Sequence, residues 1–370
     1  MELLNATGMQ AGYTMGMQPD GRELLVVAVK GTFTIPGKRH TPQLAEEQKP
    51  LVEADTFTGE PGFSSPVYEV DYPPVKHRCD VLLVGSAYAP GGKPVTRVEV
   101  SMRVGPVFKS FAVTGDRYWE SGNLAIRPGF AGLFDRMPIS YDRAFGGIDN
   151  FHKDERKHSA LMSNPVGRGF HRQLGRELVD GAPMPNTEEL KRAVTMPNAN
   201  YQPMAFGPLG RGWDPRRKLG GTYDQDWIDN TFPFLPADFN DAYYQAAPVD
   251  QQMPHPQGGE DVFLHNLTAE GQTGFQLPEI DLPVVFFYKK GGKLEHRAVI
   301  DTIILEPDEG LFTMTWRATV PLKKNIFEIP QVLVGRKSRA WWRARELGKS
   351  YYPSLDHLIR EQQAAAMEED

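Results

Sequence analysis

The sequence predicts a mainly β protein of the α+β class, in which the N- and C-terminal thirds form antiparallel sheets of a sandwich-like scaffold. Short runs rich in β-branched and aromatic residues recur in both thirds, separated by Gly/Pro turns. The chain holds 36 glycines and 31 prolines among 370 residues, which indicates many turns between short strands. Between the two thirds lies a long irregular segment with short helices, where hydrophobic residues follow neither the helix period nor the strand period.

The N-terminal third, residues 1–127, is predicted to be rich in strands. A β-hairpin is expected over residues 11–35, because AGYTMGM and ELLVVAVKGTFTI flank Pro19–Arg22, whose Pro, Asp and Gly favour a tight turn. Residues 36–77 show little periodicity and predict a surface excursion. From Cys79 onward, the runs DVLLVGSAYA, VTRVEVSMRV and VFKSFAVTG, separated by PGGKP and GP, predict a three-stranded antiparallel meander.

The central part, residues 128–260, is predicted to be an irregular insert rich in aromatic residues, Gly and Pro. Two short helices are expected in it. The first covers TEELKRAV (Thr187–Val194), with Thr187 as N-cap and acidic residues in the first turn. The second starts near Asp224, within TYDQDWIDNTF.

The last third, residues 261–340, returns to strands. FLHNL and then PVVFFYKKGGKLEHRAVIDTIILEPDEGLFTMTWRATV predict a strand, a Gly-Gly turn, a strand, an acidic turn and a strand. This outline resembles that of residues 80–114, and a duplication of the two regions stays open. The tail, residues 341–370, is expected to be helical, chiefly after Lys349. We predict that these parts form one large domain, residues 1–370.

Composition and charge argue against several classes of protein. The net charge of −6 and an isoelectric point near 5.9 disfavour nucleic-acid binding. No basic stretch followed by an apolar one begins the chain, and the longest apolar runs are strand-sized, so neither a signal peptide nor membrane insertion is expected. The single cysteine, Cys79, suits a reducing compartment, and we expect a cytoplasmic protein.

No catalytic, cofactor-binding or metal-binding constellation stands out in the sequence. The Ser-centred motifs of hydrolases and the phosphate-binding GxxxxGK[ST] loop are missing. His77 and Cys79 lie two residues apart, but a metal site needs three or four ligands. We therefore predict a non-enzymatic protein that uses no cofactor and no metal.

The stretch Tyr201–Gln251 combines Gly/Pro turns, a basic run and many aromatic residues, and two interpretations of it stay open. It is either a recognition surface, since Trp, Tyr and Arg dominate protein–protein hot spots, or a long loop that packs its aromatic residues on a sheet while its arginines pair with acids. The candidate residues for partner binding or for fold packing are Arg211, Trp213, Arg216, Arg217, Tyr223, Trp227, Phe234, Tyr243 and Tyr244.

The same stretch carries a resemblance to a known family. FGPLGRGW, PRRKLGGTYDQDW, FPFLPADF and YYQAAPVDQQ follow one another between residues 206 and 252. SYDRAFGG (140–147), NPVGRGF (164–170), TMTWRATVPL (313–322) and VLVG (332–335) extend the pattern over most of the chain. In these motifs the chain resembles a bacterial family first catalogued as a domain of unknown function, whose members are encoded in type VI secretion gene clusters.

The resemblance implies a non-enzymatic effector chaperone or adaptor. Such a protein binds a toxin effector in the cytoplasm and helps load it onto the VgrG spike or its PAAR-type tip. Our hypothesis is that a face shaped by residues 128–250 covers apolar surface on the N-terminal region of the effector. The alternatives are a hydrolase acting on carbohydrate or peptidoglycan, which would need two suitably spaced carboxylates in a cleft, and a structural component of the secretion machine. The client, the binding face, the oligomeric state and the choice between groove burial and strand addition stay open.

Overall fold

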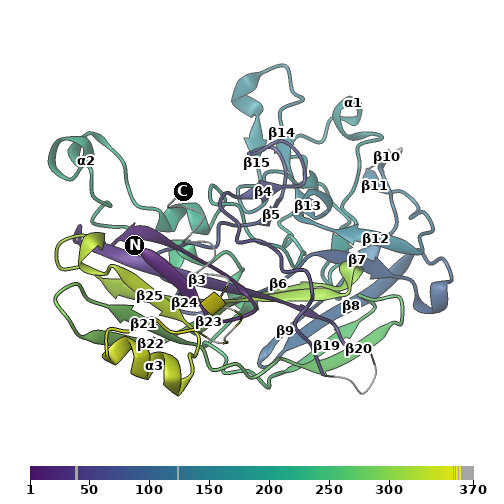
Figure 1. Ribbon diagram of the computed structural model, residues 1–370. Coiled ribbons are helices and arrows are strands. Elements are labelled where there is room, and N and C mark those ends of the chain that lie inside the picture. The colour runs from purple at the N-terminus through teal and green to yellow at the C-terminus, as the bar shows by residue number, and fades with distance from the viewer. Residues whose placement is uncertain (38–40, 123–124, 353, 355, 357, 360–370) are drawn as a thin grey trace, which may run out of the picture.

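The computed structural model describes residues 1–37, 41–122, 125–352, 354, 356 and 358–359. Its architecture is a β-sandwich with an irregular upper layer, and the predicted mainly β, α+β class is confirmed (Figure 1). The largest sheet has six strands, in the spatial order β18 (Gln252–Met253), β6 (Cys79–Leu83), β23 (Val299–Glu306), β24 (Leu311–Pro321), β3 (Glu23–Thr34) and β2 (Gln10–Met17).

Two smaller sheets pack against one face of the six-stranded sheet. One has the order β17 (Thr187–Glu188), β9 (Val107–Thr114), β8 (Arg97–Val104), β19 (Asp261–His265) and β20 (Gln272–Gln276). The other has the order β1 (Glu2–Asn5), β25 (Gln331–Val334), β21 (Pro283–Phe287) and β22 (Lys293–Arg297). Side chains of all three sheets share one hydrophobic core, for example Val27, Phe111, Phe286, Ile303 and Trp316.

Short paired strands and three short helices complete the structure. The pairs are β4 (Thr56–Phe57) with β5 (Pro66–Tyr68), β7 (Gly85–Tyr88) with β12 (Arg136–Ile139), β10 (Trp119–Ser121) with β11 (Ile126–Pro128), β13 (Phe145–Gly146) with β16 (Arg168–Gly169), and β14 (Ile148–Asp149) with β15 (Ser159–Ala160). The α-helices are α1 (Arg176–Val179), α2 (Gln225–Asn230) and α3 (Arg339–Glu346). In the part of the chain that the structure describes, no helix has the length and apolar character needed to cross a bilayer.

Four of the hairpins predicted from turn residues are confirmed, whereas the one expected across PGGKP is not formed, because β7 pairs with β12. β2 pairs with β3 across the turn Pro19–Arg22, and β8 pairs with β9 across Gly105-Pro106. β21 pairs with β22 across the Gly-Gly turn, and β23 pairs with β24 across the acidic turn that ends at Gly310. In each hairpin the turn residues and the strands that they join are neighbours in sequence, so local chemistry specifies the pairing.

The predicted meander from Cys79 is wrong in its first strand. β6 joins the six-stranded sheet, where it pairs in parallel with β23 and antiparallel with β18, while β8 and β9 lie in the five-stranded sheet. The strand is buried on both faces: Cys79, Val81 and Leu83 lie in the shared core, and Asp80 on the other face binds Lys76 and Gln245. Burial on both faces suits a strand inside a sheet, and the residues after β7 carry the chain from one sheet to the other.

The predicted helix Thr187–Val194 is also wrong. Thr187 and Glu188 form β17, which pairs with Val113 and Ala112 of β9. Glu188 is buried and accepts hydrogen bonds from Arg117 and from the backbone N–H of Val194, 3.1 Å away. These tertiary contacts override a weak local helix preference.

Of the other two predicted helices, one is confirmed and one lies mostly outside the described residues. The helix predicted near Asp224 is confirmed as α2, and the Asp224 carboxylate caps it. In the tail, α3 begins at Arg339 behind the N-cap Ser338 and ends at Glu346. Most of the helix predicted after Lys349 falls on residues 353, 355, 357 and 360–370, which lie outside the described residues.

The face of the six-stranded sheet that points away from the shared core is buried and carries several charged side chains among apolar ones such as Leu82 and Ile304. Lys30 of β3 forms an ion pair with Asp71, and Arg317 of β24 forms one with Asp301 and donates to the backbone oxygen of Asp71 at 2.8 Å. Lys76 binds Asp80 at 2.7 Å and Thr302 at 2.9 Å. Parts of the excursion 36–77 and of the segment 241–252 therefore cover this face and supply the partners that its charges need.

Replacing Arg317 by Met tests this buried ion pair. Asp301, which is 0% exposed, would be left as an unpaired buried charge, and we expect the free energy of unfolding to fall by about 3–5 kcal/mol in urea titrations. The matched control is Arg156→Met, because Arg156 pairs with Asp154 at the surface and its loss should not be measurable. Equal effects of the two substitutions would show that burial does not set the importance of Arg317.

Candidate functional site

The stretch Tyr201–Gln251 divides into two parts in space. Residues 201–219 and 241–251, here called the base, lie against the sheets. Residues 220–240, here called the arm, leave the body and carry α2 at a distance from the sheets, at the upper left of Figure 1. The nine candidate residues are distributed over both parts.

Arg216 holds the base together. It is 2% exposed, and its guanidinium forms a two-point ion pair with Glu69, in which Nη2 donates to Oε2 at 2.8 Å. The same group donates to the backbone oxygens of Leu209, at 2.7 Å, and of Tyr243, at 2.8 Å. The Arg216 side chain thus connects both halves of the base to Glu69, which follows β5. A planar guanidinium with several N–H donors is suited to binding several acceptors at once.

Arg211 reinforces the same attachment. Its Nε and Nη2 atoms donate to the two carboxylate oxygens of Asp55 at 2.6 and 3.0 Å. Burial by itself would raise the pKa of Asp55, but the hydrogen bonds from Arg211 and from the backbone of Val70 lower the pKa below its usual value. Asp55 is therefore held ionised beside Arg211. Arg217, next to Arg216 in sequence, is different: its side chain is 53% exposed and pairs with Asp214, three residues earlier.

The aromatic residues of the base are packing residues. Trp213 is 6% exposed and meets Tyr141 edge to face, with ring centroids 5.4 Å apart. Tyr243 and Tyr244 contact each other and the ring of Phe239, and Tyr243 also lies over the Arg216 guanidinium. Burial, with a contribution from Asp241, raises the pKa of Tyr244 to about 12. For this part of the stretch the structure favours the core-packing interpretation.

The arm is stabilised by hydrogen bonds across its own width. Asp238 accepts from the backbone N–H and the hydroxyl of Thr222, at 2.9 and 2.8 Å, where the arm leaves the body. Trp227 of α2 donates its indole N–H to the backbone oxygen of Phe234 at 2.9 Å. The Phe234 ring rests on Gly21 in the β2–β3 turn, where a Cβ atom would lie 2.6 Å from the ring and where φ is +83°. The arm is therefore an ordered projection that contacts the β2–β3 turn through Phe234 and the base through Phe239.

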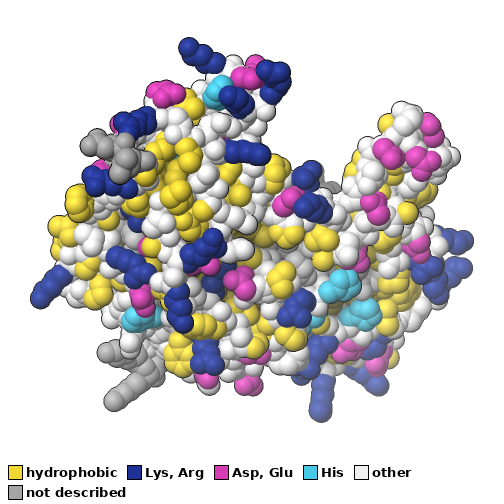
Figure 2. Space-filling view, turned by 180° about the vertical axis from the view of Figure 1, so that it is seen from behind, with side chains coloured by type: hydrophobic (Ala, Val, Ile, Leu, Met, Phe, Trp, Pro, Cys, Tyr) yellow, Lys and Arg dark blue, Asp and Glu magenta, His cyan; other side chains and the backbone are white. Residues whose placement is uncertain are grey.

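The surface of the arm is apolar and acidic. Tyr223, Ile228, Phe232 and Phe234 are 55%, 55%, 66% and 45% exposed. Four aspartates and no Lys or Arg occur between Gly220 and Asn240. In Figure 2 the arm is the lobe at the upper right, where hydrophobic and acidic side chains lie next to each other. Exposed aromatic residues on a rigid element are typical of protein-binding surfaces, so Tyr223, Trp227 and Phe234 belong to the candidate interface.

A cavity of about 450 Å³ lies between the base and the sheets. Its lining includes Pro203, Met204 and Pro248, together with the side chains of Lys109 and Tyr141. Lys109 is 7% exposed, donates to Gln251 Oε1 at 2.8 Å and lies 3.2 Å from Asp250, and its burial lowers the pKa of the amine. The arrangement can accept a small apolar group beside one cation.

Lys109 is a site residue that the sequence prediction missed. A signal for it exists, because Val107, Lys109 and Phe111 alternate along β9 and all three are buried. An inward-pointing lysine on an otherwise apolar strand face indicates a buried polar contact.

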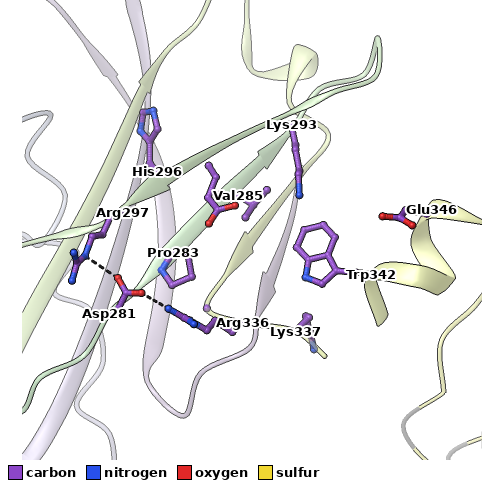
Figure 3. Close-up of a pocket in the computed structure, with 12 residues that line it drawn as sticks. Asp281, Pro283, Val285, Lys293, His296, Arg297, Arg336, Lys337, Trp342 and Glu346 are labelled. Atoms are coloured by element: carbon purple, nitrogen blue, oxygen red, sulfur yellow. Dashed lines mark hydrogen bonds and ion pairs between the residues drawn. The ribbon is translucent and has the colours of Figure 1, made fainter. Parts of the chain in front are cut away.

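A second groove, of about 770 Å³, lies on the outer face of the four-stranded sheet between β22 and α3 (Figure 3). Asp281 bridges Arg297, at 2.8 Å, and Arg336 at one end, and Lys293 lies 4.2 Å from the centre of the Trp342 ring at the other. These cations already have partners within the protein, and none of the nine candidate residues lines the groove. The arm and the base therefore remain the stronger candidate site.

The described residues contain no cluster of three or more His, Cys, Asp or Glu side chains placed to hold a metal ion. His77 lies 3.3 Å from Asp241 at the surface, while Cys79 is in the core, where burial raises the pKa of its thiol well above the usual value. The His77 side chain is therefore at the surface and the Cys79 side chain is in the core, so the two do not face a common site.

The free energy of unfolding, measured by urea titration, should fall on substitution of the buried Trp213 or Arg216 and should change little on substitution of the exposed Arg217. Trp213→Ala should lower the free energy of unfolding by about 3–5 kcal/mol, because it empties a buried volume. Arg216→Met should lower it by about 3–5 kcal/mol, because the largely buried Glu69 side chain loses its two-point ion pair and keeps only the longer contact with Arg211, at 3.5 Å. Arg217→Ala should change it by less than about 0.5 kcal/mol, as expected for a surface substitution. A comparable loss in Arg217→Ala would contradict the division of the base.

Comparison with known proteins adds one finding. No curated protein and no solved structure matches the chain. The model of the family described as "Uncharacterized protein conserved in bacteria (DUF2169)" matches residues 20–317, a range that runs from the β2–β3 turn into β24 and includes the whole arm and base. Since this match covers well over half of the chain, the protein belongs to the bacterial family DUF2169.

Proposed function

We propose that this protein is a non-enzymatic cytoplasmic chaperone or adaptor, which binds a toxin effector of a type VI secretion system and helps load it onto the VgrG spike or its PAAR-type tip. The observation that carries this proposal is the arm, an ordered projection on which Tyr223, Ile228 and Phe232 keep more than half of their surface exposed. The resemblance of the motifs in residues 206–252 to a family of secretion gene clusters supplies the biological context.

The construction of the arm suits a client that must be held and later released. Its hydrogen bonds exist before the client arrives, so binding does not require the arm to be ordered first, which lowers the entropic cost of association. Its surface is small, and a few aromatic side chains can supply most of the binding energy. Its four aspartates favour a client segment that combines apolar and basic residues, because such a segment complements the charge of the arm.

The two alternatives are less well supported. A glycoside hydrolase needs a protonated carboxyl as its general acid, but Asp214 in the cavity is bonded by Lys218 at 2.9 Å and by Arg217, and these contacts lower its pKa. A structural component of the secretion machine would be present at fixed stoichiometry in assembled particles, whereas an adaptor would be substoichiometric. Quantitative mass spectrometry of purified particles distinguishes these two roles.

Co-expression with the neighbouring toxin gene tests the proposal directly. With the protein present, we expect the toxin to be soluble, to copurify with the protein, and to appear on purified spikes; without it, soluble toxin and loaded toxin should both fall severalfold. If the toxin is equally soluble and equally loaded in the absence of the protein, the chaperone proposal is wrong.

Substitutions on the arm should weaken client binding without unfolding the protein. For the double variant Ile228→Ser/Phe232→Ser, which removes two side chains that are 55% and 66% exposed, we expect at least about a tenfold weaker affinity, or ~1.4 kcal/mol, by biolayer interferometry. The melting temperature should change little, because neither side chain is buried. Phe63→Ser is the matched control, since Phe63 is 74% exposed and lies outside the arm; an equal loss of binding in this control would argue against the arm.

A further inference from the structure

Strand β2 forms an open edge of the six-stranded sheet. It pairs with β3 along its whole length, from Gln10 opposite Lys30 to Met17 opposite Glu23, and no strand of the described part of the chain lies on its other side. The backbone N–H of Gln18 donates to the oxygen of Arg22 at 2.8 Å, which sets the phase of the ladder. Because hydrogen-bonded and non-bonded pairs alternate in an antiparallel ladder, the even-numbered residues of β2 bond to β3.

The odd-numbered residues, Ala11, Tyr13, Met15 and Met17, therefore direct their backbone N–H and C=O groups away from β3. Among the residues that the structure describes, no backbone or side-chain group bonds to any of these donors and acceptors. A row of free backbone groups at regular spacing is the template that an added β-strand recognises.

This edge lacks the usual devices that prevent strand pairing. From Leu3 to Gln18 the chain has no charged residue and no proline, and the register with β3 contains no bulge. The edge strand β22, in contrast, carries Lys293, Glu295 and Arg297 on one face. Natural edge strands are normally blunted by such charges, by proline or by bulges, so β2 is built differently from β22.

The side chains of β2 also leave an apolar strip uncovered. Tyr13 and Met15 are each 39% exposed, although Val27 and Leu25 opposite them on β3 are completely buried. On the other face, Gly12 and Gly16 lie against Tyr72 and Pro74, which leave no room for larger side chains there. An added strand would extend the apolar face beyond Tyr13 and Met15 if it carried apolar residues at alternate positions.

We infer that the β2 edge binds an extended segment of the client protein by strand addition, with uncharged sequence and apolar residues at every second position. This inference rests on the proposed chaperone function and selects strand addition as one of its binding modes. The client is favoured over a second copy of the chain because the edge continues into the arm: the Phe234 ring of the arm packs on Gly21, in the turn at the end of the same hairpin. A client can contact both surfaces at once, whereas pairing of two eight-residue edges alone buries little area for a stable dimer.

Hydrogen–deuterium exchange on the full-length protein, alone and with the copurified toxin, provides the first test. Exchange at the amides of Tyr13 and Met15 should slow at least tenfold in the complex, while the amides of Glu295 and Arg297 on the β22 edge should not change. Unchanged exchange at Tyr13 and Met15 would overturn the inference.

Two substitutions provide the second test. Met15→Pro removes a backbone N–H that faces away from β3, so it should spare the β2–β3 ladder, and Met15→Lys places a charge on the edge. Both should reduce copurified toxin at least fivefold. Glu295→Pro is the matched control, because the bond from Tyr288 N–H to the oxygen of Gly292 gives β22 a phase in which the N–H of Glu295 also faces outward.

The outcomes distinguish this inference from the proposed function. If the arm variant loses the toxin while both Met15 variants keep it, strand addition at β2 is wrong and the chaperone function stands. If the toxin is soluble and loaded without the protein, the chaperone function itself fails. If light scattering shows a dimer that Met15→Lys converts to a monomer, and the toxin still binds, the edge takes a second copy and the client assignment is overturned. If Met15→Pro lowers the melting temperature, the Met15→Lys variant and the exchange experiment decide.

Discussion

The buried charges on one face of the six-stranded sheet constrain the rest of the structure. Lys30, Arg317 and Asp80 project from three strands into a region without solvent, where an unpaired charge would cost several kcal/mol. The partners of Lys30 and Asp80 come from segments outside the sheet: Asp71 and Lys76 from the N-terminal excursion, and Gln245 from the base. Arg317 pairs with Asp301 of β23 and also donates to the backbone oxygen of Asp71. The sheet therefore requires both covering segments in a fixed position, and the sandwich and its upper layer form one unit.

The same buried contacts fix the position of the candidate site. Asp80 accepts a hydrogen bond from the backbone N–H of Ala246 at 2.8 Å, and Glu69 holds Arg216, so the two ends of the arm start from anchored chain. The arm can then expose aromatic side chains without collapsing onto the body, because Thr222 and Asp238 close its neck and Phe234 rests on a glycine. The hairpin that provides that glycine also provides the open β2 edge. Two candidate interaction surfaces thus share one structural support.

The four confirmed hairpins, the turns between their strands and the start of α2 near Asp224 could be predicted because each depends on residues that are near one another in sequence. The pairing of β6 with β23 could not, since its residues are separated by more than two hundred positions and no local pattern distinguishes a parallel partner from an antiparallel one. The segment Thr187–Val194 has helix-like composition, yet its contacts with β9 and with Arg117 come from other parts of the chain. Tertiary contacts decided both cases.

The sequence by itself determined the fold class, the local hairpins and the stretch Tyr201–Gln251 as the distinctive part of the chain. It could not divide that stretch into packing and surface residues. Arg216 and Arg217 are adjacent and identical in type, but only Arg216 meets Glu69, 147 positions earlier in the chain. Trp213 and Trp227 differ in the same way, one buried against Tyr141 and the other on the arm. Burial depends on which distant surfaces the folded chain brings together, so only the tertiary structure could assign these side chains.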